Sequence, residues 1–343
     1  MIGRGTAGKY WVHVGGHDPF APYQAQVVAY GNDNTRCKFY QPSVPDYEEL
    51  GGALRGWYSR FFVLCLALNG TPVNSRFVFS FSGSPRPEDS SWAQPLAPPP
   101  RKTPKAAFLE TTEDGTAIAN HRRNPNSPYT PTAMAHSSVG YVPPGLSIRH
   151  EQTGIYRVIL PGLGTKNPGL AQVTAVGGSD AHCVAGLPFR SSNDPSILEV
   201  VVQGWNERDR VDTGFILNYD EEVTRSTVAH QGARAYAGNQ FAASYTPDRS
   251  YNTGQVSGFP GTNTAYHLGK GWYQMHHSEI FDTPNSVWVG ASGIFPSYCK
   301  IEAWGSSASA RGTDVYVRCF DAEGNPADTP YFETCQGTEI RSS

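Results

Sequence analysis

The chain has 343 residues, a net charge of -3 and 17% charged residues. A chain this close to neutrality lacks the basic face that neutralises phosphates, so we expect no nucleic-acid partner. No apolar run approaches the ~18 residues of a membrane helix, so no membrane span is expected. Gly (36), Pro (27) and 12% aromatic residues occur in short alternating runs and turns, which predicts an all-β fold.

The first predicted unit covers residues 1–82. Its apolar runs, such as "GKYWV", "QVVAYG" and "RFVFSF", have the length and alternation of short strands. Residues 46–58, "DYEELGGALRGWY", are interpreted as a longer loop with one short helical turn. Trp57 and Tyr58 lie in this loop outside the repeated pattern, so we interpret them as possible ligand or interface aromatics.

Two further units are predicted downstream. A Pro-rich segment, residues 83–107, is expected to be a stiff linker to a second unit at 108–220. A second linker, residues 221–232, leads to a third unit at 233–343. A full unit offers about seven short strands joined by turns, which is typical of an Ig-like or Greek-key β-sandwich.

One phrase occurs three times with nearly constant spacing. A Gly follows a Tyr by 21 positions in Tyr10–Gly31 and Tyr156–Gly177, and by 20 positions in Tyr273–Gly293. In each copy a Cys follows this Gly by six positions. This spacing predicts internal repeats, and therefore tandem β-sandwich units.

The first copy lacks the front part of the phrase. In the second and third copies, "PYTP" and "SYTP" segments lead to His150 and His267, whereas the first copy has Arg4 at this position and no such segment before it. A sandwich without its front strands exposes unpaired backbone and an apolar seam. We therefore expect another copy of the chain to add the strands, giving head-to-tail self-assembly.

Matched cysteine positions in the first and third units predict two disulfides, Cys37–Cys65 and Cys299–Cys319. Each would stabilise its unit by roughly 3–4 kcal/mol in the chain-entropy model. Buried free thiols are the alternative. Cys183 and Cys335 remain, and they could join each other, join another chain or stay reduced. Disulfides persist in oxidising surroundings, so we predict an extracellular or cell-surface protein.

The sequence contains no recognisable catalytic or nucleotide-binding motif, and we predict no catalytic residues, no cofactor and no metal site. The most plausible metal ligands are four histidines, His13, His17, His276 and His277. His13 and His276 share the repeat position of Ile159, which indicates a face of a sandwich rather than a ligand.

Two other sets of polar residues recur between the copies. Asn74, Asp212 and Asp328 follow equivalent turns, and we interpret them as acceptors for backbone N–H groups. A calcium site would need further oxygen ligands that the sequence does not show. His150 and His267 are interpreted as scaffold residues that hydrogen-bond a neighbouring carbonyl.

The motifs G-x-Y-x-V, Q-V-T-A-x-G, C-K-x-x-x-W and V-R-C-F-D-x-x-G-x-P-x-D together resemble a repeat of uncharacterised secreted proteins of actinobacteria and similar soil bacteria. Residues 271–331 carry the resemblance best, and the second copy departs from it at Gly204. The resemblance implies export and a repetitive role at a surface or in a matrix. It implies no catalytic activity.

Three functions follow from these observations. The first is a secreted structural or adhesive protein that assembles with copies of itself into a fibre or surface layer. The alternative is a carbohydrate-binding module or lectin whose loop aromatics bind glycans or a cell-surface polymer. The third is a hydrolase with residues dispersed on loops, for which the sequence offers no constellation.

Overall fold

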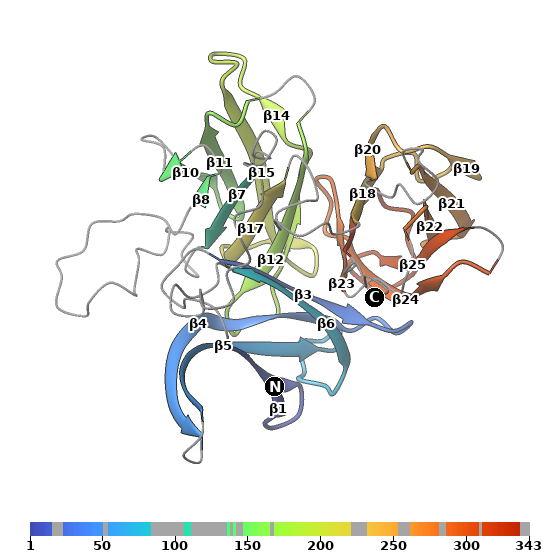
Figure 1. Ribbon diagram of the computed structural model, residues 1–343. Coiled ribbons are helices and arrows are strands. Elements are labelled where there is room, and N and C mark those ends of the chain that lie inside the picture. The colour runs from blue at the N-terminus through green and yellow to red at the C-terminus, as the bar shows by residue number, and fades with distance from the viewer. Residues whose placement is uncertain are drawn as a thin grey trace, which may run out of the picture.

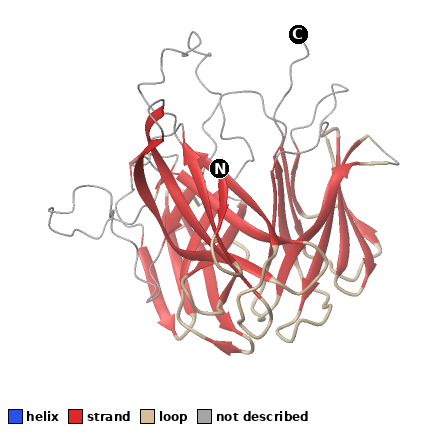
Figure 2. Cartoon of the chain, turned by 90° about the horizontal axis from the view of Figure 1, so that it is seen from below, coloured by secondary structure: helices blue, strands red, loops and turns tan. Residues whose placement is uncertain are grey.

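The computed structural model contains strands, turns and loops and no helix in the part of the chain that it describes (Figure 2). It therefore contains, over those residues, no helix that is long and apolar enough to cross a bilayer. The structure describes residues 1–15, 23–50, 54–83, 106–110, 136–137, 140–141, 147–164, 168–220, 232–252, 261–280, 286–308 and 311–336. The predicted all-β class is confirmed.

The strands form three lobes that meet at the centre of the molecule (Figure 1). The first lobe contains β1 (Ile2–Arg4), β2 (Lys9–Gly15), β3 (Tyr23–Tyr30), β4 (Arg36–Leu50), β5 (Leu54–Leu66) and β6 (Arg76–Gly83). Strands β1-β2-β5-β4 are neighbours in one sheet, and β3 pairs with β6 in another.

The second lobe contains β7 (Ala106–Glu110), β8 (His136–Ser137), β9 (Gly140–Tyr141), β10 (Ser147–Gln152), β11 (Ile155–Pro161), β12 (Leu170–Val176), β13 (His182–Ala185), β14 (Phe189–Arg190), β15 (Ile197–Asn206), β16 (Asp209–Arg210) and β17 (Gly214–Asp220). One sheet has the order β12-β17-β7-β8-β9, and the other has the order β10-β11-β15-β13.

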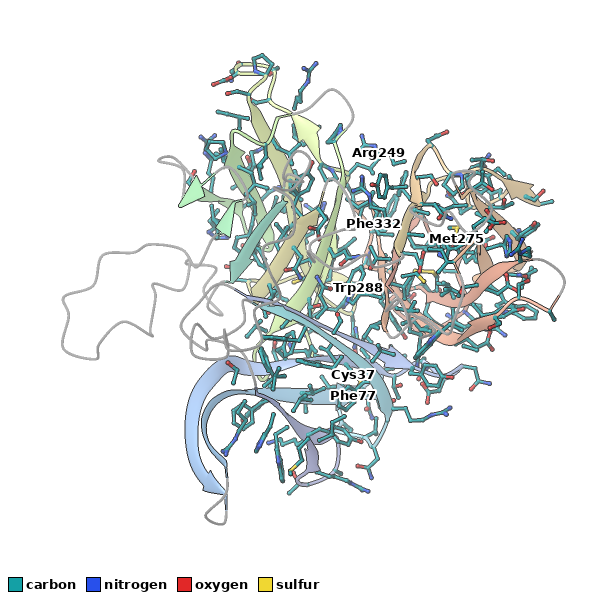
Figure 3. All side chains as sticks on the ribbon, viewed as in Figure 1. Cys37, Phe77, Arg249, Met275, Trp288 and Phe332 are labelled. Atoms are coloured by element: carbon teal, nitrogen blue, oxygen red, sulfur yellow. A yellow bond between two sulfur atoms is a disulfide. The ribbon has the colours of Figure 1, made fainter. Side chains whose placement is uncertain are left out.

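The third lobe contains β18 (Gly232–Ala237), β19 (Ser244–Tyr245), β20 (Arg249–Asn252), β21 (Asn263–Gly269), β22 (Trp272–Ser278), β23 (Ser286–Ala291), β24 (Tyr298–Ser306), β25 (Gly312–Phe320) and β26 (Tyr331–Gln336). Its strands form the orders β20-β18-β26-β23 and β19-β21-β22-β25-β24. Met275 of β22 lies buried inside this lobe (Figure 3).

The main hydrophobic core extends across the lobes. Apolar residues of β3, β12 and β23 belong to one buried cluster, together with the interior of the second and third lobes. Trp288 and Phe332 lie at the centre, where the lobes meet (Figure 3). A second cluster fills the first lobe and includes Phe39, Phe61 and Val63. Burial of this shared apolar surface stabilises the lobes together rather than one by one.

Parallel β-bridges connect the lobes in a closed ring. Strand β4 pairs with β12 through Phe39 and Val176, and β24 pairs with β3 through Ile301 and Tyr30. The third bridge joins Ala185 of β13 to Ser292, which follows β23. Each lobe therefore contacts both of the others, and two sheets run continuously from one lobe into the next.

The same glycine hydrogen bond occurs at all three bridges. The N–H of Gly31 donates to the Ile301 carbonyl at 2.9 Å, and that of Gly177 donates to the Phe39 carbonyl at 3.0 Å. The N–H of Gly293 donates to the Ala185 carbonyl at 3.3 Å. These glycines have φ values of 125°, 129° and 132°, a region that residues with a Cβ rarely adopt.

Both predicted disulfides are confirmed. Cys37 lies opposite Cys65 in the β4–β5 ladder, and Cys299 lies opposite Cys319 in the β24–β25 ladder. Their Cα atoms are 4.1 and 4.0 Å apart. In the β13–β15 ladder the same register places Cys183 opposite Gly204. Cys183 and Cys335 are free thiols.

The prediction of a helical turn in residues 46–58 is wrong for the described residues. Strands β4 and β5 continue as a long hairpin that curves away from the molecule (Figure 1). Trp57 and Tyr58 therefore lie in a strand, opposite Tyr47 and Asp46, and not in a loop. Cross-strand hydrogen bonding outweighs the helix propensity of "EEL" and "AL".

The predicted domain bounds remain predictions. Strand β6 ends at Gly83, the first residue of the predicted linker. Strand β7 begins at Ala106, so it includes the last two residues of that linker. Most of both predicted linkers, residues 84–105 and 221–231, lies outside the described residues.

Candidate functional site

Three side chains from equivalent sequence positions meet at the centre of the ring. Arg36, His182 and Tyr298 each immediately precede the Cys of the repeated phrase. The Arg36 Nη1 lies 3.0 Å from His182 Nδ1, and the guanidinium lies 5.3 Å from the Tyr298 ring centroid. The Tyr298 hydroxyl donates to the Asn34 carbonyl at 2.9 Å. We call these three residues the central junction.

The central junction holds a neutral histidine against a permanent cation. Arg36 always carries protons on its nitrogens, so His182 Nδ1 must accept the hydrogen bond and the ring proton lies on Nε2. Burial, and then the charges of Arg36 and Lys38, lower the pKa of His182 to about 3. Protonation of His182 would place a second cation in a buried site, so the junction depends on its neutral form.

Buried lysines clamp two of the three lobe interfaces. Lys38 Nζ donates to the Ala181 carbonyl at 3.0 Å and so joins the first lobe to the second. Lys300 Nζ bonds to Thr35 Oγ1 and pairs with Asp33, which joins the third lobe to the first. The equivalent residue at the third interface is Val184, which has no charge to offer. The interface between the second and third lobes is therefore held differently.

That third interface opens into a groove. At the first two interfaces a tight turn closes over the neighbouring loop, with Gly70 packed on Asp180 and Gly324 packed on Asn34. At the third, a groove of about 590 Å³ separates Arg208 of the turn from the loop 293–297. This volume lies within the usual range of small-molecule sites. By comparison, the cavity beside the central junction has about 80 Å³, enough for water only.

The groove combines exposed apolar groups with hydrogen-bonding groups. Ile294 and Phe295 are 59% and 69% exposed, and the equivalent loops of the other lobes have Asn32-Asp33 and Gly178-Ser179 at these positions. Its polar lining comes from several elements and comprises Arg208, Gln240, Ser292, Ser297, Asp321, Glu323, Asp328 and Thr329. An aromatic ring beside carboxylate and amide groups is suited to bind a polar ring-shaped ligand such as a sugar.

The outer edge of β6 is open in the described part of the chain. Strand β17 lies between β12 and β7, and β26 lies between β23 and β18. Strand β6 occupies the same place in the first lobe, but only β3 pairs with it among the described residues. An edge of this kind presents unpaired N–H and C=O groups to any extended chain.

The core beneath this edge is incompletely covered. Strands β6 and β17 each have three large side chains that face the interior of their lobe, at equivalent positions. Those of β17 are fully buried (Phe215, Leu217 and Tyr219), whereas those of β6 are only half-buried (Phe77, Phe79 and Phe81). Apolar surface that remains exposed next to an open edge is typical of a site where a strand is added.

The recurring Asp and Asn residues satisfy backbone donors, as predicted. Asp328 Oδ1 accepts from the Gly271 N–H at 2.8 Å, from the Tyr273 hydroxyl at 3.2 Å and from His267 at 3.0 Å. Asp212 makes the equivalent three contacts in the second lobe, and Asn74 accepts from the Gly8 N–H. The histidines bond these carboxylates, so the prediction of a carbonyl partner is wrong. The network fixes a turn.

One cluster of potential metal ligands lies inside the third lobe. His277 of β22 faces Glu333 and Cys335 of β26, and all three residues are buried. One ligand atom from each lies within 4.8 Å of the others. In the sequence, His276 was judged not to be a ligand because the equivalent position of the second copy is Ile159. His277 was not compared in this way, so the sequence prediction missed this cluster. His17 lies outside the described residues, and so do the side chains of Trp57 and Tyr58.

Comparison with known proteins leaves these sites to be interpreted from their geometry alone. The chain matches no protein-family model, no curated protein and no solved structure.

Proposed function

We propose that this protein is a secreted structural or adhesive protein built from three related β-sandwich units, and that it assembles with further copies of itself by strand addition at β6. The two disulfides are typical of proteins that fold in oxidising surroundings. Extracellular or cell-surface location is part of the proposal. No catalytic role is assigned.

The three lobes are related, in this proposal, by a pseudo-threefold axis through the central junction. Support comes from the three glycine hydrogen bonds, each from the Gly of one copy to the residue two positions after the Cys of the neighbouring copy. A closed ring also gives the protein a rigid body, since no lobe can move without breaking two bridges. Rigidity of this kind suits a structural subunit.

The observation that carries the self-assembly proposal is that β6 pairs, among the described residues, with β3 alone, above half-buried phenylalanines. In the other lobes, β7 and β18 run antiparallel to β17 and β26 and complete the sheet. Their sequences, "AAFLE" and "GARAYA", are the basis for the kind of strand proposed at β6: an extended segment of mainly small and apolar residues. An extended segment of a second copy would take this place at β6 by strand addition.

Sedimentation velocity over a dilution series, combined with hydrogen exchange, tests the proposal. We expect the mean mass to rise with concentration, and the amides of residues 76–83 to become protected in step with it. Residues 216–220 of β17, which pair with β12 on one side and with β7 on the other, serve as the internal control and should stay protected throughout.

Two outcomes would contradict self-assembly. The first is a monomer at every concentration whose β6 amides exchange freely. The second is a monomer whose β6 amides are as well protected as those of β17, which would mean that the chain covers its own edge.

A second candidate function, carbohydrate binding, is favoured by the groove between the second and third lobes. Its exposed Phe295 lies beside carboxylates and an amide, whereas the equivalent interfaces are closed. Phe295→Ala should abolish binding on a glycan array. Phe241→Ala is the matched control, because Phe241 is 70% exposed but does not line the groove. An array without any binding would exclude this function, and Trp57→Ala would test the β4–β5 hairpin as the alternative platform.

A further inference from the structure

We propose that His277, Glu333 and Cys335 form a structural binding site for a divalent transition-metal ion of the Zn²⁺ class inside the third lobe. The site would join the two sheets of this lobe, because His277 lies on β22 and the other two ligands lie on the facing strand β26. It is independent of the β6 edge and of the groove.

The first argument comes from the equivalent positions of the other lobes. The position of His277 is occupied by Val14 and Leu160 in the first and second lobes. The positions of Glu333 and Cys335 are occupied there by apolar residues throughout, namely Phe79, Phe81, Leu217 and Tyr219. Three core positions have therefore changed from apolar residues to metal-ligand types in one lobe, and all three changes meet at one place.

The second argument is that the histidine is held in the form that binds metals. Asn263 Nδ2 donates to the Arg234 carbonyl, to Ser250 Oγ and to the Tyr251 carbonyl, which fixes the orientation of its amide. Its Oδ1 therefore faces His277 Nδ1, 2.8 Å away, and accepts a hydrogen bond from the Nδ1–H group. The Nε2 lone pair is left to point toward Glu333 and Cys335. Metal-bound histidines are held in this manner by a second hydrogen bond.

The third argument is the polar atoms that remain unsatisfied. His277 Nε2 lies 2.7 Å from Glu333 Oε2, yet neither this nitrogen nor either Glu333 oxygen has a hydrogen-bond partner within the described residues. Both side chains are fully buried, where unsatisfied polar groups are strongly unfavourable. A simple ion pair would leave Cys335 without a role. A bound cation would satisfy all three ligand atoms at once.

The ligand set indicates the class of metal. Imidazole, carboxylate and thiolate together select Zn²⁺-like ions, and Ca²⁺ or Mg²⁺ would require oxygen ligands. Binding would convert the Cys335 thiol to a thiolate, with release of its proton to solvent. Cys335 lies between Ala233 and Val287 on the neighbouring strands, so the site is enclosed by apolar groups and would exclude water.

Metal analysis of the purified full-length chain tests the proposal. The protein is incubated in buffer containing Zn²⁺, and unbound metal is then removed by dialysis. We expect about one Zn²⁺ per chain in the wild-type protein and loss of this metal in Cys335→Ser. Two variants are matched controls. His276→Ala removes the adjacent histidine, which pairs with Asp314 instead, and Cys183→Ser removes the other free thiol. Both should keep the metal.

A second measurement applies even if the Cys335 variant fails to fold. Wild-type protein loaded with Co²⁺ should show a thiolate-to-cobalt charge-transfer band. Chelation should lower the melting temperature of the wild-type protein, and Zn²⁺ should restore it. A folded wild-type protein that binds no Zn²⁺, or a Co²⁺ form without the thiolate band, would overturn the proposal.

Discussion

Protonation of His182 should make this protein acid-sensitive in a defined pH range. In the folded state burial, Arg36 and Lys38 lower the pKa of His182 to about 3, against an ordinary value of 6.5. Between these values the unfolded chain binds a proton that the folded chain excludes, so the free energy of unfolding falls as the pH falls from 6.5 toward 3. The full stabilisation is present only above about pH 6.5.

The size of the effect follows from the two pKa values. At pH 4.5 the unfolded histidine is almost fully protonated and the folded one almost fully neutral, which costs roughly 2–3 kcal/mol relative to pH 7. Urea unfolding of the wild-type protein and of His182→Gln at both pH values measures it. The glutamine amide oxygen can still accept from Arg36 but does not titrate.

The comparison of the two proteins isolates the histidine. Carboxylates that protonate in the same range are common to both and cancel in the difference. We expect the wild-type protein to lose about 2–3 kcal/mol more than the variant between pH 7 and pH 4.5. Equal losses would refute the assignment of a neutral, buried His182 to the central junction.

Two further predictions concern glycines. Gly177 has a φ of 129°, so Gly177→Ala should lower the free energy of unfolding by about 1–3 kcal/mol. Gly178→Ala is the control and should lower it less, because its Cβ would make only an ordinary contact with Tyr40. Equal urea midpoints for the two variants would contradict the role of Gly177 in the ring. Gly204→Cys places a thiol opposite Cys183, but its Cβ would lie 2.5 Å from the Val211 carbonyl oxygen. We expect a lower melting temperature and no third disulfide. The number of free thiols, counted in denaturant with chelator, shows whether the disulfide has formed. A stable protein with one free thiol would contradict this expectation.

The last prediction also explains why the second lobe has no disulfide. Gly204 precedes Asp212 by eight positions, whereas Cys65 and Cys319 precede Asn74 and Asp328 by nine. The shorter turn brings the Val211 backbone into the space of a Cβ at position 204. The glycine is therefore required by the turn, and a cysteine cannot replace it unless the turn moves.

Strand positions and both disulfides were predictable because they depend on local alternation and on matched spacing. The prediction of a helical turn at residues 46–58 was wrong, because the pairing of β4 with β5 decides the structure there and local sequence does not reveal it. The ring depends on single hydrogen bonds between residues as distant as Gly31 and Ile301, which leave no periodic pattern in the sequence.

The candidate sites were visible in the sequence only as departures from the predicted repeat. Val184 stands where two copies have lysine, and Ile294-Phe295 stands where the others have small or polar residues. Likewise, Glu333 replaces residues that are apolar in the other copies. Each departure has physical meaning only once the structure shows which neighbours it faces.

Placing all three lobes on one polypeptide has a consequence for how the protein can change. In a trimer of identical subunits, any substitution at a contact appears three times, and a destabilising change is therefore multiplied. Here each contact is encoded separately, so the contact between the second and third lobes can have Val184 in place of a lysine, and can be open, while the Lys38 and Lys300 clamps keep the ring closed. Covalent linkage thus lets one position specialise while the other two preserve the shape.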